Sequence, residues 1–330
     1  MQGEKYYIGV DGGATNVRAV IADSYGNILG FSKEVASTPF FSKEMKSSLH
    51  DVLKKVIYDL FTSIHKVNPL IESISLGMTG LGIKGQTETE IKKIINELIK
   101  ANNIRVYSDM EIAYRGAALD KPGILIYAGT GANCYGLDNK GQVDNVSGWG
   151  YLIDDEGGGY FIGVKALRAV YRAYDERGGK TILTEKIKEY FQEDDLKKLC
   201  FKIYSEDDIN RNRIGLIAPL VTDAAKTGDK ISKNILNESG FALAECAAAL
   251  YKKLSYKLPV DIYTVGGVFK AGNLIEKPFK KRIMYYIDSF QILKPVYPAV
   301  IGALLYAKNE KIQDIENSFL QNIDNTIEEM

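Results

Sequence analysis

Several short stretches of this chain place glycines, small polar residues and an acid directly after an apolar run. The first is DGGATN, residues 11–16, which lies between the apolar runs 6–10 and 17–22. Its glycines permit positive φ and leave backbone N–H groups unshielded. Such amides can bind an anion without a basic side chain, and the acid beside them can bind a hard cation. An ordinary hairpin turn is the simpler alternative for this stretch taken alone.

A second glycine-rich stretch repeats this pattern. AGTGAN, residues 128–133, follows the apolar run 123–127 and precedes another strand and turn. When the two copies are aligned, Asn16 and Asn133 fall at matching positions. A third strand, 260–265, runs directly into GGVFKAGN. The two related loops favour an internal duplication of a strand–loop–strand unit that binds phosphate.

Asp109 is the candidate for proton transfer. It follows the predicted strand 104–107 and precedes a helix predicted to start near Glu111. Sheets of α/β proteins bind ligands at the carboxyl ends of their strands. A carboxylate at such a position can orient an acceptor hydroxyl and take its proton during phosphoryl transfer. The alternative is a helix N-cap, for which Asp is also favoured.

The elements that must position these residues form two successive α/β patterns. The first third predicts three strands, a helix over 43–66, and then strand, helix, strand and helix in alternation. The pattern restarts at residue 123 with three strands. The rest is largely helical, with helices expected at 159–176, 181–191, 194–204, 206–227 and 229–257, then the strand 260–265 and a final helix pair.

Composition narrows the class of protein. At 330 residues the chain is long enough for two domains. Its 42 basic and 42 acidic side chains balance, so neither nucleic acid nor a membrane surface is an expected partner. Three scattered cysteines indicate reduced thiols in the cytoplasm. The two histidines, His50 and His65, lie in one predicted helix, so carboxylates and backbone amides must carry any chemistry.

The motifs together resemble those of the acetate and sugar kinase–Hsc70–actin superfamily. Within it, the chain is similar to the N-acetylglucosamine kinase branch of the BadF/BadG/BcrA/BcrD ATPase family. The resemblance covers nearly the whole chain, and its most specific part is GWGYLIDDEGGGYFIG, residues 148–163. It implies an α/β fold of two actin-like (ribonuclease H-like) domains with a central interdomain cleft and a helical insert in the second. We expect residues 1–116 plus about 300–330 in the first domain and 117–299 in the second.

The same resemblance implies ATP and Mg²⁺ as cofactors and a role for each motif. Asp109 would be the base. Asp11 would bind Mg²⁺ through water, and Asp155 would help to bind its water shell. A helix near 211–226 would cover the adenine. The nucleotide would contact Gly12, Gly13, Ala14, Thr15, Asn16, Gly129, Thr130, Gly131, Asn133, Gly266 and Gly267. The acceptor would contact Thr38, Thr79, Gly80, Asp109, Gly148, Trp149, Gly150 and Asp155. For Trp149, a plain core position is the alternative.

The resemblance implies transfer of phosphate to a hydroxyl of N-acetylglucosamine or a hexose, and we expect a homodimer. Two alternatives stay open. The stretch 36–41 lacks the Asn with which such kinases bind the sugar, and Lys84 and Arg115 could pair with an acid such as 2-keto-3-deoxygluconate. Some relatives are instead ATPases that activate a reductase or dehydratase, and those hold an iron–sulfur cluster with cysteines.

Overall fold

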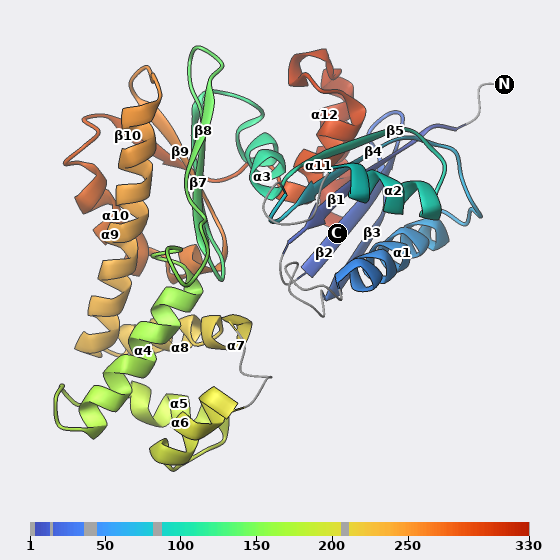
Figure 1. The fold of residues 1–330 in the computed structure, drawn as a ribbon. Coiled ribbons are helices and arrows are strands. Elements are labelled where there is room, and N and C mark those ends of the chain that lie inside the picture. Colours follow the sequence, from blue (N-terminus) through green and yellow to red (C-terminus); the bar gives the residue numbers. More distant parts are fainter. Residues whose placement is uncertain (1–3, 14–15, 36–44, 82–87, 206–210, 330) are drawn as a thin grey trace. The chain divides into compact units, whose positions relative to one another are not determined.

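The computed structural model describes residues 4–13, 16–35, 45–81, 88–205 and 211–329. The chain divides into two compact units, one of Met1–Lys121 with Pro295–Met330 and one of Pro122–Lys294 (Figure 1). Within the described ranges, no helix is both long and apolar enough to cross a membrane.

The first unit is built on a five-stranded mixed sheet in the order β3-β2-β1-β4-β5. Strands β1, β2 and β3 form an antiparallel meander, and β4 and β5 continue from β1 in parallel. The strands are Tyr6–Gly12, Asn16–Asp23, Ile28–Val35, Ile71–Met78 and Ala101–Ser108. The helices are α1 (Met45–Ser63), α2 (Glu88–Leu98), α3 (Asp109–Ala118), α11 (Ala299–Lys308) and α12 (Asn317–Thr326).

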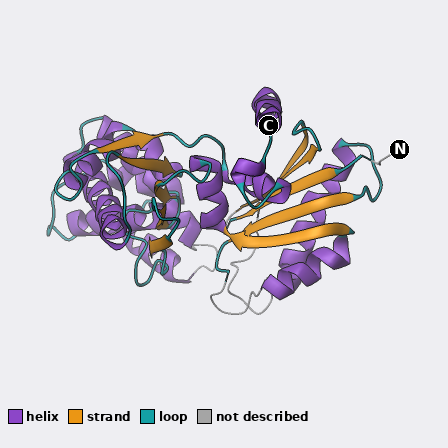
Figure 2. Ribbon diagram, turned by 90° about the horizontal axis from the view of Figure 1, so that it is seen from above, coloured by secondary structure: helices purple, strands orange, loops and turns teal. Residues whose placement is uncertain are grey.

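Successive side chains along each strand point to opposite faces of this sheet. Both faces are buried, because helices lie on both sides of the strands (Figure 2). Ile8 and Val10 of β1 pack with apolar residues of α1 and α2. Tyr7, on the opposite face of β1, packs with α11 and α12. The C-terminal segment therefore completes the first unit, because its helices bury the face that α1 and α2 leave open.

The second unit repeats the same topology. Its sheet has the order β10-β9-β6-β7-β8, in which β6, β7 and β8 form the meander and β9 and β10 continue in parallel. The strands are Gly123–Ala128, Ala132–Leu137, Val143–Ser147, Val260–Val265 and Phe290–Leu293. Two sheets with the same order of strands agree with the duplication expected from the two glycine-rich loops.

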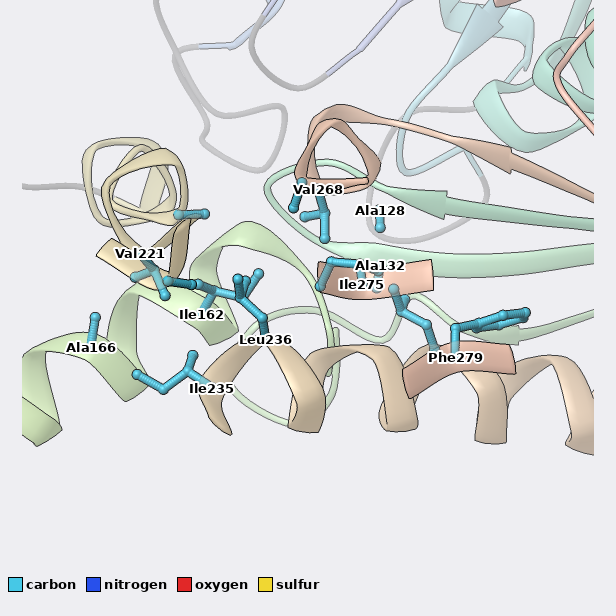
Figure 3. Packing of buried hydrophobic residues seen from close by; sticks show 14 of the residues in the cluster. Ala128, Ala132, Ile162, Ala166, Val221, Ile235, Leu236, Val268, Ile275 and Phe279 are labelled. Atoms are coloured by element: carbon cyan, nitrogen blue, oxygen red, sulfur yellow. The ribbon is translucent and has the colours of Figure 1, made fainter. Parts of the chain in front are cut away.

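The second unit inserts its helices between β8 and β9. They are α4 (Gly159–Tyr174), α5 (Leu183–Phe191), α6 (Leu196–Ser205), α7 (Arg211–Gly215), α8 (Ala218–Lys226) and α9 (Lys230–Lys253), with α10 (Asn273–Ile283) following β9. A single core joins these helices to the sheet. In Figure 3, Ile162 of α4, Leu236 of α9 and Phe279 of α10 lie in one cluster with Ala128 and Ala132.

Four sequence predictions need correction. The helix expected over 206–227 is two helices, because Pro219 has no N–H to donate and suits the first turn of a new helix. The short strand β10 was missed, since its four residues show no clear alternation. Strand β5 starts at Ala101, ahead of the predicted 104. The chain ends in α11 and α12 after α10 and β10, where only a helix pair was expected.

Candidate active site

In the first unit, the carboxyl ends of β1, β4 and β5 bring three of the candidate residues together. The N–H of Thr79, just after β4, donates to the carbonyl of Gly12 at the end of β1, at 3.0 Å. The Thr79 hydroxyl donates to Oδ2 of Asp109, just after β5, at 2.7 Å. Parallel strands end at one edge of a sheet, so this grouping follows from the order β1-β4-β5.

Asp109 is the first residue of α3 and is not its N-cap. Ser108 caps the helix, since its hydroxyl accepts from the N–H of Glu111 while the Glu111 carboxylate accepts from the N–H of Ser108. The N-cap alternative for Asp109 is therefore wrong. Burial raises the pKa of Asp109, and the hydrogen bond from Thr79 opposes that rise. A desolvated carboxylate with a raised pKa is suited to accept a proton.

Asp11 lies one residue before the end of β1 and is 8 % exposed. Its Oδ2 accepts from Nη1 of Arg18, across the hairpin on β2, at 3.2 Å. Burial raises the pKa of Asp11 to about 6, and the negative charge of Asp109 adds to the rise while Arg18 opposes it. The two carboxylates therefore lie close enough to interact. A buried carboxylate in this position suits Mg²⁺, which binds through one or two carboxylates, waters and phosphate oxygens.

Glycines hold the elements that carry both acids against α11. A side-chain carbon on Gly9 would lie 2.4 Å from the backbone nitrogen of Leu304. One on Gly302 would lie only 1.9 Å from the carbonyl oxygen of Ile112 in α3. Helix α11 thus packs directly on the backbones of β1 and α3. The segment YPAVIGALLYA, residues 297–307, therefore packs on the backbones of the two elements that carry Asp11 and Asp109.

The remaining candidates of the first unit lie beside these groups or outside the described residues. Gly13 follows β1 directly, and Asn16 is the first residue of β2, opposite Val35 of β3. Gly80 follows Thr79 with φ at 77°, a conformation that glycine adopts readily. Ala14, Thr15, Thr38 and Lys84 lie outside the described residues.

In the second unit, the loop Gly129–Gly131 joins β6 to β7 and is held by the start of α4. The N–H of Gly159 donates to the carbonyl of Gly129 at 2.8 Å, and the N–H of Tyr160 donates to that of Thr130 at 2.9 Å. Gly158 lies so close that a side-chain carbon there would be 2.6 Å from the carbonyl carbon of Gly131. Contact with this loop therefore explains Gly158 and Gly159, whereas Gly157, with φ at 88°, lies against Leu243 of α9.

Asp155 lies over the same loop. It is 4 % exposed and has φ at 63°. Its Oδ2 accepts from Nη2 of Arg211, the first residue of α7, at 2.5 Å, and its Oδ1 accepts from the N–H of Gly150 at 3.3 Å. Burial raises the pKa of Asp155, and the Arg211 charge opposes the rise. The carboxylate is therefore engaged by an arginine and an amide of its own unit.

In the segment 148–153, Trp149 and residues 151–153 are exposed, whereas Gly148 and Gly150 are half-buried. Gly148, with φ at 82°, lies against Asn133, since a side-chain carbon there would be 2.4 Å from its Nδ2. Oδ1 of Asn133 is buried and has no partner within the described ranges. Trp149 is 72 % exposed, so the core alternative for this residue is wrong. Gly150, with φ at 99°, donates to Asp155 as described above.

The third glycine pair lies beside the same loop. Gly266 follows β9 with φ at 114°, and a side-chain carbon on it would lie 2.3 Å from the carbonyl oxygen of Ala128. Gly267 has open space where its side chain would be. The second unit thus brings Gly129–Gly131, 148–155 and 266–267 to one region at the carboxyl ends of β6 and β9.

Arg115 does not line a site, contrary to one sequence-based alternative. Its side chain is fully buried and pairs with Asp120 at 2.9 Å. It donates to the carbonyl oxygens of Asn309 and Glu310 and lies over the ring of Tyr306. These contacts tie α3 to the segment after α11 and use the cation structurally.

Sequence reasoning missed both arginines that contact the candidate acids. Arg18 carried a signal, because it is two residues beyond Asn16 on a strand and so shares its face. Arg211 carried none, because its contact with Asp155 joins residues 56 positions apart.

The fold and these sites together define the class of protein. The sequence matches the BadF/BadG/BcrA/BcrD ATPase family over residues 8–307, and the chain belongs to that family. It is 31 % identical to an N-acetylmuramic acid/N-acetylglucosamine kinase of Clostridium acetobutylicum, over 93 % of this chain and 99 % of that protein. It is 30 % identical to an N-acetyl-D-glucosamine kinase of Dictyostelium discoideum, again over 93 % and 99 %.

Solved structures share the fold. A putative N-acetylglucosamine kinase from Chromobacterium violaceum superposes with a TM-score of 0.72, at 21 % identity, over 91 % of this chain and 98 % of that one. A glucokinase of the ROK family from Streptomyces griseus superposes with a TM-score of 0.58, at 16 % identity, over 92 % and 99 %. The chain therefore has the two-domain actin-like fold of sugar kinases, as the sequence predicted.

Proposed function

We propose that this protein is an ATP-dependent sugar kinase that phosphorylates a hydroxyl of N-acetylglucosamine or a closely related small sugar. The observation that carries the proposal is the half-buried Asp109 carboxylate, which lies where β5 ends and accepts a hydrogen bond from the Thr79 hydroxyl. Family membership and the two relatives that cover the full chain support the same reaction.

Asp109 accepts the proton of the acceptor hydroxyl, whose oxygen then forms a bond to the γ-phosphorus. The bond from that phosphorus to the bridging oxygen breaks, and ADP leaves. Such a reaction depends mostly on positioning and on electrostatic stabilisation of the phosphoryl oxygens. The raised pKa of Asp109 supports its role as the acceptor of the proton.

Backbone amides of the two glycine-rich loops bind the nucleotide phosphates. The described parts are Gly12, Gly13 and Asn16 in the first unit, and Gly129, Thr130, Gly131 and Asn133 in the second. Gly266 and Gly267 leave room for the adenosine, as the open space beside Gly267 supports. Gly80, Gly148, Trp149 and Gly150 contact the acceptor.

Asp11 would hold Mg²⁺, and the ion would supply positive charge to neutralise the phosphate oxygens. Asp11 fits this role better than Asp155, because both carboxylate oxygens of Asp155 already accept hydrogen bonds, from Arg211 and from the N–H of Gly150, whereas Arg18 contacts Oδ2 of Asp11.

We also propose that the protein is a cytoplasmic homodimer. Light scattering after size exclusion measures its molar mass and so tests the oligomeric state.

A coupled assay of ADP release tests the function. The acceptors are N-acetylglucosamine, glucose, glucosamine, mannose and 2-keto-3-deoxygluconate, with a control that lacks an acceptor. We expect release that depends on a neutral sugar, with N-acetylglucosamine giving the largest kcat/KM. Release that ignores every acceptor would contradict the proposal and favour an ATPase. Release with the keto acid alone would contradict the choice of acceptor.

A further inference from the structure

The side chain of Arg211 lies directly on the glycine loop of the second unit. A side-chain carbon on Gly131 would lie 2.3 Å from Nη2 of Arg211 and 2.3 Å from Oδ2 of Asp155. The ion pair therefore fills the space that any side chain at position 131 would need. Gly131 is required here for the close approach of a guanidinium to the loop backbone.

Asp155 fixes the position of this guanidinium. Its own backbone carbonyl accepts from the N–H of Gly158 at 3.1 Å, and its Oδ1 accepts from the N–H of Gly150. Cζ of Arg211 lies 5.4 Å from the centre of the Tyr151 ring. The carboxylate, which the Gly150 amide holds, and the aromatic ring thus orient Arg211 before any ligand binds, which lowers the cost of binding.

Arg211 has more capacity to donate than Asp155 uses. A guanidinium carries five N–H donors, and the contact with Asp155 uses Nη2. Its Nε is buried and has no partner in the part of the chain that the structure describes. The Arg211 side chain as a whole is 27 % exposed to solvent. The arrangement can accept an oxyanion at the exposed edge while Asp155 holds the opposite side.

We propose that Arg211 binds the phosphoryl group that is transferred from the nucleotide, a role that rests on the sugar kinase function proposed above. Arg211 contacts both the loop Gly129–Gly131, proposed to hold phosphates, and the segment 148–155, proposed to contact the acceptor. The transferred phosphoryl group must lie next to both, because it passes from the nucleotide to the acceptor. Planar guanidinium groups suit its charged oxygens. Asp155 is then a positioning residue that acts through Arg211.

The test compares Arg211→Ala and Arg211→Lys with Arg177→Ala, which removes an arginine elsewhere in the same unit. Arg177 is exposed, pairs with Asp175 and is not part of the proposed site. Calorimetry measures the affinity of each variant for ADP and for a non-hydrolysable ATP analogue, with Mg²⁺. Turnover is measured with N-acetylglucosamine, with and without added guanidinium chloride.

For Arg211→Ala we expect kcat to fall ~10²-fold or more, because an arginine on the transferred phosphoryl group contributes ~10³ to 10⁵ in related reactions. Affinity for the ATP analogue should fall more than affinity for ADP, and guanidinium should restore part of the turnover. Arg211→Lys should retain more activity than Arg211→Ala, and Arg177→Ala should match the wild type.

Three results would overturn the role of Arg211. One is turnover of Arg211→Ala and Arg211→Lys close to that of the wild type. Another is equal loss of affinity for ADP and the analogue together with a lower melting temperature, which would make Arg211 structural. The third is a higher KM for N-acetylglucosamine with an unchanged kcat and unchanged nucleotide affinities, which would assign Arg211 to the acceptor. If the wild type phosphorylates no sugar, the proposed function fails, whereas the nucleotide affinities still test Arg211.

Discussion

The hydroxyl of Thr79 donates a hydrogen bond to Oδ2 of Asp109 at 2.7 Å, across the edge where β4 and β5 end. The bond leaves Oδ1 of Asp109 out of this contact and fixes the rotation of the carboxylate. It also stabilises the charged form of a group whose burial disfavours charge. The pair therefore sets both the direction and the proton affinity of the proposed base.

Replacing Asp109 with Asn should greatly slow transfer while leaving the fold intact. We expect kcat to fall by ~10² to 10⁴, the range for a positioned proton acceptor. Affinity for ADP should not change. Steady-state kinetics with N-acetylglucosamine and calorimetry with ADP measure the two effects, and a variant with nearly intact turnover would show that Asp109 is not the base.

The same variant should be more stable than the wild type at neutral pH. Because the folded-state pKa of Asp109 is raised, the stability linked to its protonated form is complete below the ordinary value of 3.8 and is lost as the pH rises through the raised pKa. At neutral pH the partly desolvated charge of Asp109 therefore costs stability, and Asn removes it. Melting temperatures at neutral pH and towards pH 4 should show a gain that shrinks as the pH falls; a loss at neutral pH would contradict the account.

Thr79→Val should move the acidic limb of the pH profile of kcat/KM to higher pH. The profile reports the pKa of the free base, and activity falls as Asp109 becomes protonated. The Thr79 hydroxyl lowers that pKa, so its removal raises it further. Thr79→Ser keeps the donor and should retain the wild-type limb. The same displacement in both variants would show that the hydroxyl is not responsible.

Gly302→Ala should impair catalysis, because this substitution in α11 displaces α3, whose first residue is Asp109. The added carbon would lie 1.9 Å from the carbonyl oxygen of Ile112, so α3 must move away from α11. Because a misplacement of ~1 Å can cost ~10²-fold in rate, we expect a kcat lowered by ~10- to 100-fold, with a lower melting temperature. Gly179→Ala, where the nearest atom is 3.6 Å away, is the matched control. Unchanged kinetics in Gly302→Ala would mean that α11 does not position Asp109.

Arg115→Met should destabilise the first unit without changing recognition of the acceptor. It leaves Asp120 and two carbonyl oxygens without their buried donor, and breaking such a pair costs ~3–5 kcal/mol. Denaturant unfolding measures the loss. Arg177→Met, which breaks an exposed pair with Asp175, should cost ~1 kcal/mol at most. If the Arg115→Met variant were fully folded but had a higher KM for the sugar, Arg115 would instead belong to the acceptor site.

The fold could be predicted largely because both of its halves carry local signals. The glycine-rich loops 11–16 and 128–133 each follow an apolar strand, and the two sheets have the same order. Asp109 could be found because it stands where a predicted strand meets a predicted helix. The sequence alone could not show whether Ser108 or Asp109 is the N-cap of α3, because both residue types are favoured at that position.

The partners of the acids could not be predicted, because they depend on contacts between distant residues. Arg115 lies six positions after Asp109, and only its burial against the segment around residue 309 shows that it is structural. Arg211 and Asp155 are in contact although they are 56 positions apart, with the helices α4, α5 and α6 between them in the sequence. Neither contact leaves a periodic pattern in the sequence.

The central claim is tested most directly by looking for the phosphorylated sugar itself. Wild-type protein and Asp109→Asn are incubated with N-acetylglucosamine and Mg·ATP, and phosphorus NMR and mass spectrometry follow the products. The account predicts one mole of sugar phosphate for each mole of ADP with the wild type, and a rate reduced by ~10² or more with the variant. Formation of ADP and inorganic phosphate with no sugar phosphate would contradict it.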